Sequence, residues 1–229
     1  MKYFFILFTA VFLQACVDYV QLAKQEMDVS VLRDNPIRYQ NIGTYPGSIV
    51  CGRYSTSRKK GDDKFSAFIY RDKKVNTRPS TIDLAIFCTE DSQRNLLLIT
   101  GIDVEKCDSS KLATILRDFQ TIGHALAQYE TDNGTLPRDS QGLDALINPS
   151  ILQPKPQRFK SGGYIAELPT DPWGKHYLYK GPVFGGSRGQ YSLRTLGADS
   201  VVGGAAENAD IDTQYLKYID HIGGCGSGN

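Results

Sequence analysis

This sequence has few histidines, a net charge close to zero and no closely spaced cysteines. The 229 residues carry 26 lysines and arginines against 25 aspartates and glutamates, which argues against the concentrated basic face of a nucleic-acid-binding protein. The three histidines lie far apart and lack metal-ligand spacing: His124, His176 and His221. The Gly-Gly-Ser-Arg-Gly segment at 185–189 lies between two expected hairpin strands, which is the wrong setting for a catalytic nucleophile. We therefore expect neither an enzyme nor a small-molecule substrate.

The pronounced apolar run of the chain lies within residues 1–15 and is too short to span a bilayer of ~30 Å. One lysine precedes it, and it ends in Leu-Gln-Ala-Cys at 13–16, which resembles a bacterial lipobox. We expect residues 1–15 to be a lipoprotein signal peptide and Cys16 to carry the lipid that anchors the chain in a membrane. The alternative is an ordinary cleaved signal that abuts a cysteine. Asp18 favours the inner membrane by resemblance to enterobacterial lipoproteins, with the outer membrane as the other choice.

Four cysteines remain after Cys16, an even number in an exported chain, so two disulfides are expected. Three pairings can be written for them. We favour Cys51–Cys88 inside a first domain and Cys107–Cys225 between the C-terminal tail and the joint of two domains. No two of these cysteines are closely spaced, which argues against a thiolate metal site.

The pattern changes near residue 106. Residues 16–106 predict a small α+β sheet domain of no recognised family. It has a helix over 19–32, a loop around 36–47, and four strand-like runs at 48–54, 65–70, 82–88 and 96–100. Residues 107–229 open with good helix-capping chemistry at Asp108, and apolar residues follow at helical spacing until Asn133-Gly134. Alternating strands are expected at 176–180 and 190–195, and Trp173 is expected to fill the core between loop and strand.

A glycine-rich loop between two aspartates follows the last of these strands. Asp199 and Asp210 flank Gly-Gly at 203–204, and such a loop can turn its carbonyls inward around a hard cation such as Ca²⁺ while the aspartates supply charge. Taken alone, the loop is weak evidence for a metal, because loops of this composition are more commonly ordinary surface turns.

Several motifs precede this loop in a fixed order. They are Tyr-Glu-Thr-Asp-Asn-Gly-Thr-Leu-Pro at 129–137, Gln-Gly-Leu-Asp-Ala-Leu at 141–146, Gly-Gly-Tyr-Ile at 162–165 and Leu-Pro-Thr-Asp-Pro-Trp-Gly at 168–174. Together they resemble the periplasmic domain of the major pseudopilin of type II secretion, protein G, over residues 110–212. The resemblance implies a long amphipathic helix packed on a short antiparallel sheet, with calcium held by the side chains of Asp199 and Asp210 and the carbonyls of Leu196 and Val201. The family usually has glycine where this chain has Ser200.

The chain differs from this family in the segment ahead of the long helix. A pseudopilin carries an apolar helix of about twenty residues ahead of its long helix, whereas residues 101–111 are polar here. We therefore expect an α+β, calcium-stabilised, membrane-tethered interaction module with partners in type II secretion machinery. The alternative is a periplasmic lipoprotein that uses the same domain to bind a secreted or envelope protein.

Overall fold

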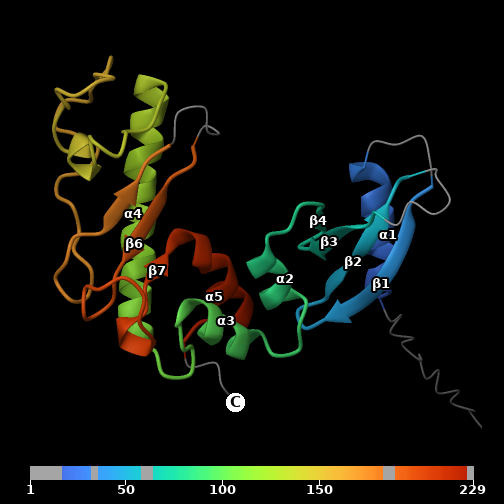
Figure 1. Ribbon diagram of the computed structural model, residues 1–229. Helices are drawn as coiled ribbons and strands as arrows, with labels where there is room; N and C mark the ends of the chain where they lie inside the picture. Colours follow the sequence, from blue (N-terminus) through green and yellow to red (C-terminus); the bar gives the residue numbers. More distant parts are fainter. Residues whose placement is uncertain (1–16, 32–35, 58–63, 183–188, 226–229) are drawn as a thin grey trace, which may run out of the picture. The chain divides into compact units, whose positions relative to one another are not determined.

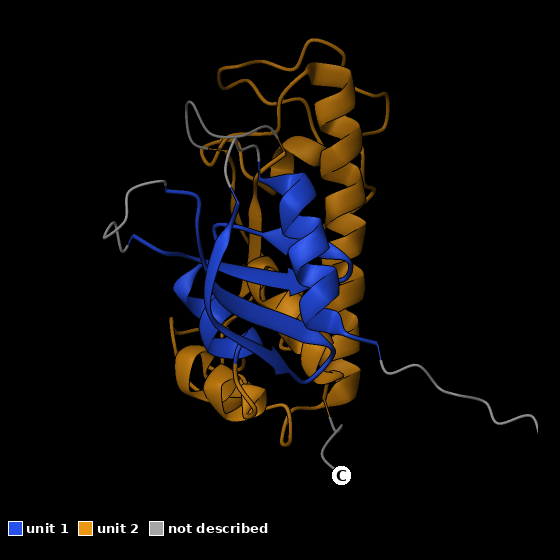
Figure 2. Ribbon diagram, turned by 90° about the vertical axis from the view of Figure 1, so that its right-hand side faces the viewer, with its two compact units in different colours: residues 1–88 blue, residues 89–229 orange. Residues whose placement is uncertain are grey.

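The chain forms two compact units, residues 1–88 and 89–229 (Figures 1 and 2). The computed structural model describes residues 17–31, 36–57, 64–182 and 189–225. The expected signal peptide and Cys16 lie outside this range. The division between the units falls at Cys88, whereas the sequence pattern places a domain boundary at 106/107, inside the second unit.

Unit 1 is a helix packed on a four-stranded antiparallel sheet. The sheet has the order β1-β2-β3-β4, made of Arg38–Tyr45, Ile49–Ser55, Ser66–Arg71 and Lys74–Asn76. Helix α1, Tyr19–Ser30, buries Ala23 and Met27 against Val50, Phe68 and Tyr70 of the sheet. The Asp18 carboxylate accepts a hydrogen bond from the Gln21 amide and so caps this helix.

Three sequence expectations for this region are wrong. The stretch expected as a loop around 36–47 contains strand β1, whose register shifts between Gln40 and Gly43 as in a bulge. The runs at 82–88 and 96–100 are helices, α2 over Thr81–Phe87 and α3 over Ser92–Thr100. Both helices carry capping signals that outweigh their β-branched and apolar content: a Ser80/Asp83 capping box on α2, and Asp91 and Gly101 at the two ends of α3.

Unit 2 places one long helix on a three-stranded antiparallel sheet. Helix α4 spans Ser109–Asn133, and the sheet has the order β5-β6-β7, made of Leu178–Lys180, Ser192–Thr195 and Ile211–Asp212. Asp108 caps the start of α4 and Gly134 ends it in the left-handed conformation, which confirms both predicted bounds. Short 3₁₀ turns lie at Leu143–Leu146, Ala206–Asn208 and Thr213–Tyr215, and helix α5, Leu216–Ile222, completes the unit.

The core of unit 2 lies between α4 and the sheet. One face of the helix supplies Ile115, Phe119, Ile122, Leu126 and Tyr129, which pack with Leu136, Leu146, Tyr164, Tyr177 and Leu193. Trp173 is half-buried against this core, in the position expected of it. Among the described residues no helix is both long and apolar enough to cross a membrane.

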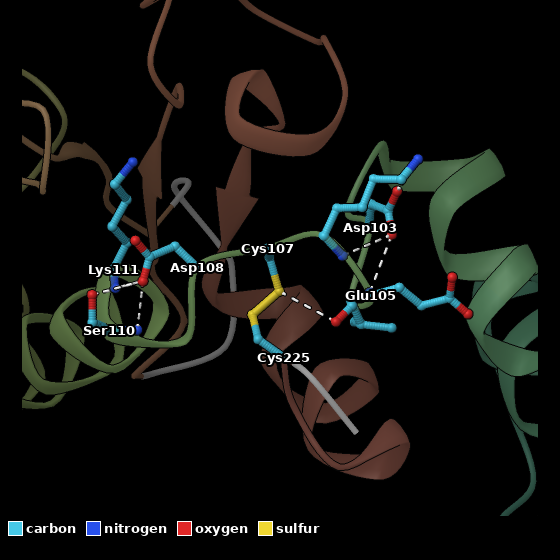
Figure 3. Close-up of a disulfide and its surroundings, with 9 residues drawn as sticks. Asp103, Glu105, Cys107, Asp108, Ser110, Lys111 and Cys225 are labelled. Carbon is cyan, nitrogen blue, oxygen red and sulfur yellow. Dashed lines mark hydrogen bonds and ion pairs between the residues drawn. A yellow bond between two sulfur atoms is a disulfide. The ribbon is translucent and has the colours of Figure 1, made fainter. Parts of the chain in front are cut away.

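Each unit contains one disulfide. Cys51 of β2 pairs with Cys88 at the end of α2, and Cys107 pairs with Cys225 after α5. These are the two pairings that the sequence favours. The second holds Cys225, just after α5, against the turn that joins α3 to α4 (Figure 3).

Candidate metal centre

The candidate loop begins where β6 ends, and a buried carboxylate fixes that point. Asp171, 4% exposed, accepts hydrogen bonds from the amides of Trp173 and Lys175 through Oδ1. Its Oδ2 accepts the Thr195 hydroxyl at 2.6 Å. The Thr195 Oγ1 in turn accepts the Gly197 amide. The turn at 171–174 therefore sets where the strand stops and the loop starts.

The two ends of the loop meet in a narrow neck. The Ala198 amide donates to the Glu207 carbonyl at 2.9 Å. Gly197 has φ +66°, and a Cβ there would lie 2.7 Å from the Glu207 carbonyl oxygen, so only glycine fits. The loop between these residues is exposed, including 61% of Val201.

The neck is also anchored to the preceding helices. Lys111 of α4 forms an ion pair with Glu207 at 2.7 Å and lies 5.4 Å from the centre of the Trp173 ring. The hydrogen bond to Glu207 raises the pKa of Lys111. The Ala206 amide donates to the carbonyl of Gly101, which ends α3. Figure 3 shows Lys111 beside Asp108, whose carboxylate caps α4, and the Cys107–Cys225 disulfide next to them.

The two expected side-chain ligands have different surroundings. Asp199 is exposed, and its Oδ1 accepts the amide of Val201, another expected ligand, at 3.0 Å. Ser200 between them has φ +57°, a left-handed conformation that the glycine usual in the family adopts without strain. Leu196 is half-buried directly after β6. Asp210 is only 8% exposed and ends the loop before β7.

Asp210 is the residue of the loop whose surroundings best suit a bound cation. Its Oδ1 is buried and has no hydrogen-bond partner within the described parts of the chain. A buried carboxylate oxygen without a hydrogen-bond partner is costly, and such an atom is available to accept a cation or a water molecule. In the same parts of the chain no three His, Cys, Asp or Glu side chains gather as a metal centre. A cation here would therefore rely on main-chain carbonyls as well as carboxylates, a donor set that suits Ca²⁺.

Three residues that support the loop escaped the sequence reasoning: Asp171, Arg194 and Asp212. Arg194 of β6 lies opposite Asp212 of β7 and forms ion pairs with both Asp212 and Asp210. The alternation of β6 could have shown that Arg194 and Asp212 share a face, but only if the two-residue strand β7 had been recognised. The three histidines are dispersed on α4, before β5 and on α5, as their sequence spacing implies.

Fold and site together define a class: a small α+β domain in which one long helix covers a three-stranded antiparallel sheet and a closed oxygen-rich loop joins its last two strands. The family model "Type II secretion system (T2SS), protein G" matches residues 104–214. Type II secretion system core protein G of Vibrio cholerae is 41% identical over 113 residues, which cover 49% of this chain and 73% of that protein. The Pseudomonas aeruginosa protein of the same name is 38% identical over 104 residues, covering 45% and 71%. The chain belongs to the protein G family of type II secretion.

A solved structure, the major pseudopilin from the type 2 secretion system of enterohaemorrhagic Escherichia coli, is 30% identical and covers 45% of this chain and 86% of its own length. The TM-score is 0.39, and family membership rests on the sequence relatives.

Proposed function

We propose that this chain is a non-catalytic structural component of type II secretion machinery, tethered to a membrane by lipid at Cys16 and stabilised by calcium. The protein G domain at 104–214 supports this proposal, together with the way that its long helix starts. Helix α4 begins at an Asp108 cap, after a turn closed by the Cys107–Cys225 disulfide, and does not continue an apolar helix. A lipid at Cys16 would give the domain a membrane anchor in place of such an apolar helix.

Deletion of the chain tests its role in secretion. Loss of a structural component should leave exported substrates in the periplasm, and expression of the wild-type chain should restore their release. Normal secretion in the deletion strain would favour the alternative, a periplasmic lipoprotein that uses a protein G domain to bind a secreted or envelope protein.

The lipid anchor is supported by Leu-Gln-Ala-Cys at 13–16. Cells fed a clickable fatty acid should label the wild-type chain and not Cys16→Ser, which should also remain uncleaved or be released from the membrane. A wild-type chain that is processed but unlabelled would contradict the proposal.

Asp18 has a structural role in addition to its proposed part in inner-membrane retention, because it caps α1. Asp18→Ser keeps a capping hydroxyl and removes the carboxylate. A shift of this variant to the outer membrane in fractionated cells would therefore reflect sorting, and unchanged inner-membrane location would argue against a retention signal at Asp18.

Calcium binding is supported by the buried Oδ1 of Asp210, which has no hydrogen-bond partner among the residues that the structure describes. An ion that binds only the folded state stabilises it by about 2.7 kcal/mol when its free concentration is 100 times Kd. Chelation should lower the Tm of the full-length chain, Asp199→Ala should remove the response to added calcium, and Mg²⁺ should substitute poorly. Superimposable melting curves in calcium and in chelator would show that the loop is only a turn.

A further inference from the structure

Asp210 and Asp212 are two buried carboxylates that share one cation, the guanidinium of Arg194. Asp212 is 1% exposed, and its Oδ2 lies 3.1 Å from Arg194 Nε. Asp210 Oδ2 lies 3.7 Å from Arg194 Nη1. Two buried carboxylates with one arginine leave one negative charge without a partner in this cluster.

The position of Arg194 is fixed independently of Asp210. Arg194 and Asp212 are opposite each other in the antiparallel pair β6–β7. The other oxygen of Asp212 accepts the Gln214 amide at 3.0 Å, so that carboxylate cannot turn away without losing a second hydrogen bond. Because a guanidinium is a rigid planar fork, fixing Nε also fixes the direction of Nη1. The Arg194 guanidinium is therefore held in place beside the Asp210 carboxylate by contacts that do not involve Asp210.

The two oxygens of Asp210 are thus different. Oδ2 faces the arginine, whereas Oδ1 is buried without a partner in the described residues. A carboxylate that binds a metal is commonly held by a hydrogen bond or ion pair to its other oxygen, and loss of that support typically costs 10–100-fold in metal affinity.

We propose that Arg194 is a positioning residue for calcium: it holds Asp210 through Oδ2 so that Oδ1 is presented to the ion, and it offsets the charge of Asp212. This inference rests on the proposed calcium site and adds to it a residue that does not itself bind the metal.

The direction in which calcium affinity changes when Arg194 is removed distinguishes positioning of Asp210 from simple electrostatics. Arg194 is positive, so if it acted only through its charge, removing it would attract a cation more strongly and tighten binding. If it positions Asp210, removing it weakens binding despite the more negative surroundings. The two accounts predict opposite changes in Kd.

The experiment measures Ca²⁺ affinity of the full-length chain by calorimetry, and Tb³⁺ as a luminescent substitute. Arg194→Met should raise the Kd for Ca²⁺ about tenfold or more. Arg194→Lys keeps the charge and loses the planar fork, so it should also bind more weakly than the wild type. Arg117→Met is the matched control, because Arg117 lies on helix α4, 3.9 Å from another buried aspartate, Asp118, and this variant should bind Ca²⁺ as the wild type does.

A second measurement counts the water molecules bound to the ion. Tb³⁺ luminescence lifetimes in H₂O and D₂O give this number, and release of Asp210 Oδ1 should raise it by about one in Arg194→Met and leave it unchanged in Arg117→Met. General destabilisation would not change this number in the molecules that still bind. If Arg194→Met fails to fold, as shown by its Trp173 fluorescence, Arg194→Lys decides.

The outcomes separate this proposal from the calcium site on which it rests. A wild-type chain that binds no calcium removes both. A wild-type chain that binds calcium, with Arg194 variants that bind as tightly or more tightly and keep the same number of bound waters, overturns the role of Arg194 alone. Wild-type affinity in Arg194→Lys shows that a point charge is sufficient, which also overturns positioning by the guanidinium.

Discussion

A hydrogen bond between two buried polar side chains joins the long helix to the segment that leads into β5. The Tyr177 hydroxyl, from the residue before β5, donates to Asp118 of α4 at 2.8 Å, and both residues are less than 10% exposed, at 5% and 7%. Burial raises the pKa of Tyr177, and the hydrogen bond to Asp118 adds to this rise. The tyrosine is therefore neutral at ordinary pH, and its proton remains available to the carboxylate.

Tyr177→Phe should destabilise unit 2 by about 1–3 kcal/mol, because it leaves a buried carboxylate oxygen without its donor. Tyr179→Phe is the control: its hydroxyl donates to the neutral carbonyl of Pro137, so its loss should cost only about 1 kcal/mol. Urea unfolding followed by Trp173 fluorescence measures both. Equal losses in the two variants would contradict a special cost at Asp118.

Such partnerships could not be predicted from the sequence. Helical spacing correctly placed the apolar face of α4, but Asp118 and Tyr177 are 59 positions apart, and nothing local to either residue indicates the other. The same holds for Asp171 and Thr195, 24 positions apart. Asp199 and Asp210 could be proposed as ligands because their loop carries a family pattern, whereas Arg194 became visible only when strand β7 was placed beside β6.

At the scale of elements, the end of α3 is fitted to the candidate loop. Gly101 has φ +77° at the end of this helix, and its carbonyl accepts the amide of Ala206. A Cβ on Gly101 would collide with the carbonyl oxygen of Gly204. Gly134 ends α4 with nearly the same φ, +75°, and no atom of the described residues lies within 4 Å of where its Cβ would be.

Alanine at these two glycines separates backbone strain from the collision. Gly134→Ala should cost about 1–2 kcal/mol, the cost of a left-handed non-glycine residue. Gly101→Ala should cost at least about 1 kcal/mol more, because the loop backbone must also move. Urea denaturation of both variants measures the difference. If the two losses are equal, the packing of the loop on α3 contributes nothing to stability.

The stability that the Asp108 cap gives to the start of α4 depends on pH. The hydroxyl of Ser110 and the amides of Lys111 and Ser110 donate to Asp108 and lower its pKa below the usual 3.8. A carboxylate with a lowered folded pKa stabilises the fold above its unfolded pKa and loses that contribution as the pH falls through the folded value. Asp108→Ala should therefore melt below the wild type at pH 7, and the gap in Tm should narrow below about pH 4. A gap that stays constant down to pH 2 would contradict this role for the charge.

Elements were predictable where their ends carry local signals that were recognised. The cap at Asp108 and the stop at Gly134 gave α4 correctly. The same kinds of signal begin α2 at Ser80 and end α3 at Gly101, but the apolar, β-branched residues of these segments favour strands when the sequence is taken alone. Strand β1 was missed for the opposite reason, since its flanking prolines and glycines are typical of a loop, although its residues alternate between exposed and half-buried over part of its length.

At the scale of the whole molecule, each disulfide belongs to one unit and closes a chain segment of different length. Cys51–Cys88 spans 37 positions within unit 1, and Cys107–Cys225 spans 118 within unit 2. The chain-entropy relation gives about 4 kcal/mol for the first and about 5 kcal/mol for the second, as upper values that native strain reduces. The second has a further role, because it holds the tail that follows α5 against the turn in front of α4.

The single tryptophan, Trp173, packs against the core of unit 2 and therefore reports the unfolding of that unit. Its fluorescence can show which of the two disulfides stabilises unit 2. Replacing Cys107 and Cys225 together by serine should lower the urea midpoint reported by Trp173 fluorescence, by an amount that corresponds to several kcal/mol. It should also weaken calcium binding, because the α3–α4 joint that this disulfide closes contacts the candidate loop through Gly101 and Lys111. The Cys51→Ser, Cys88→Ser double variant is the matched control and should shift the Trp173 transition less. A Trp173 midpoint unchanged by loss of Cys107–Cys225 would show that this disulfide does not stabilise the protein G domain.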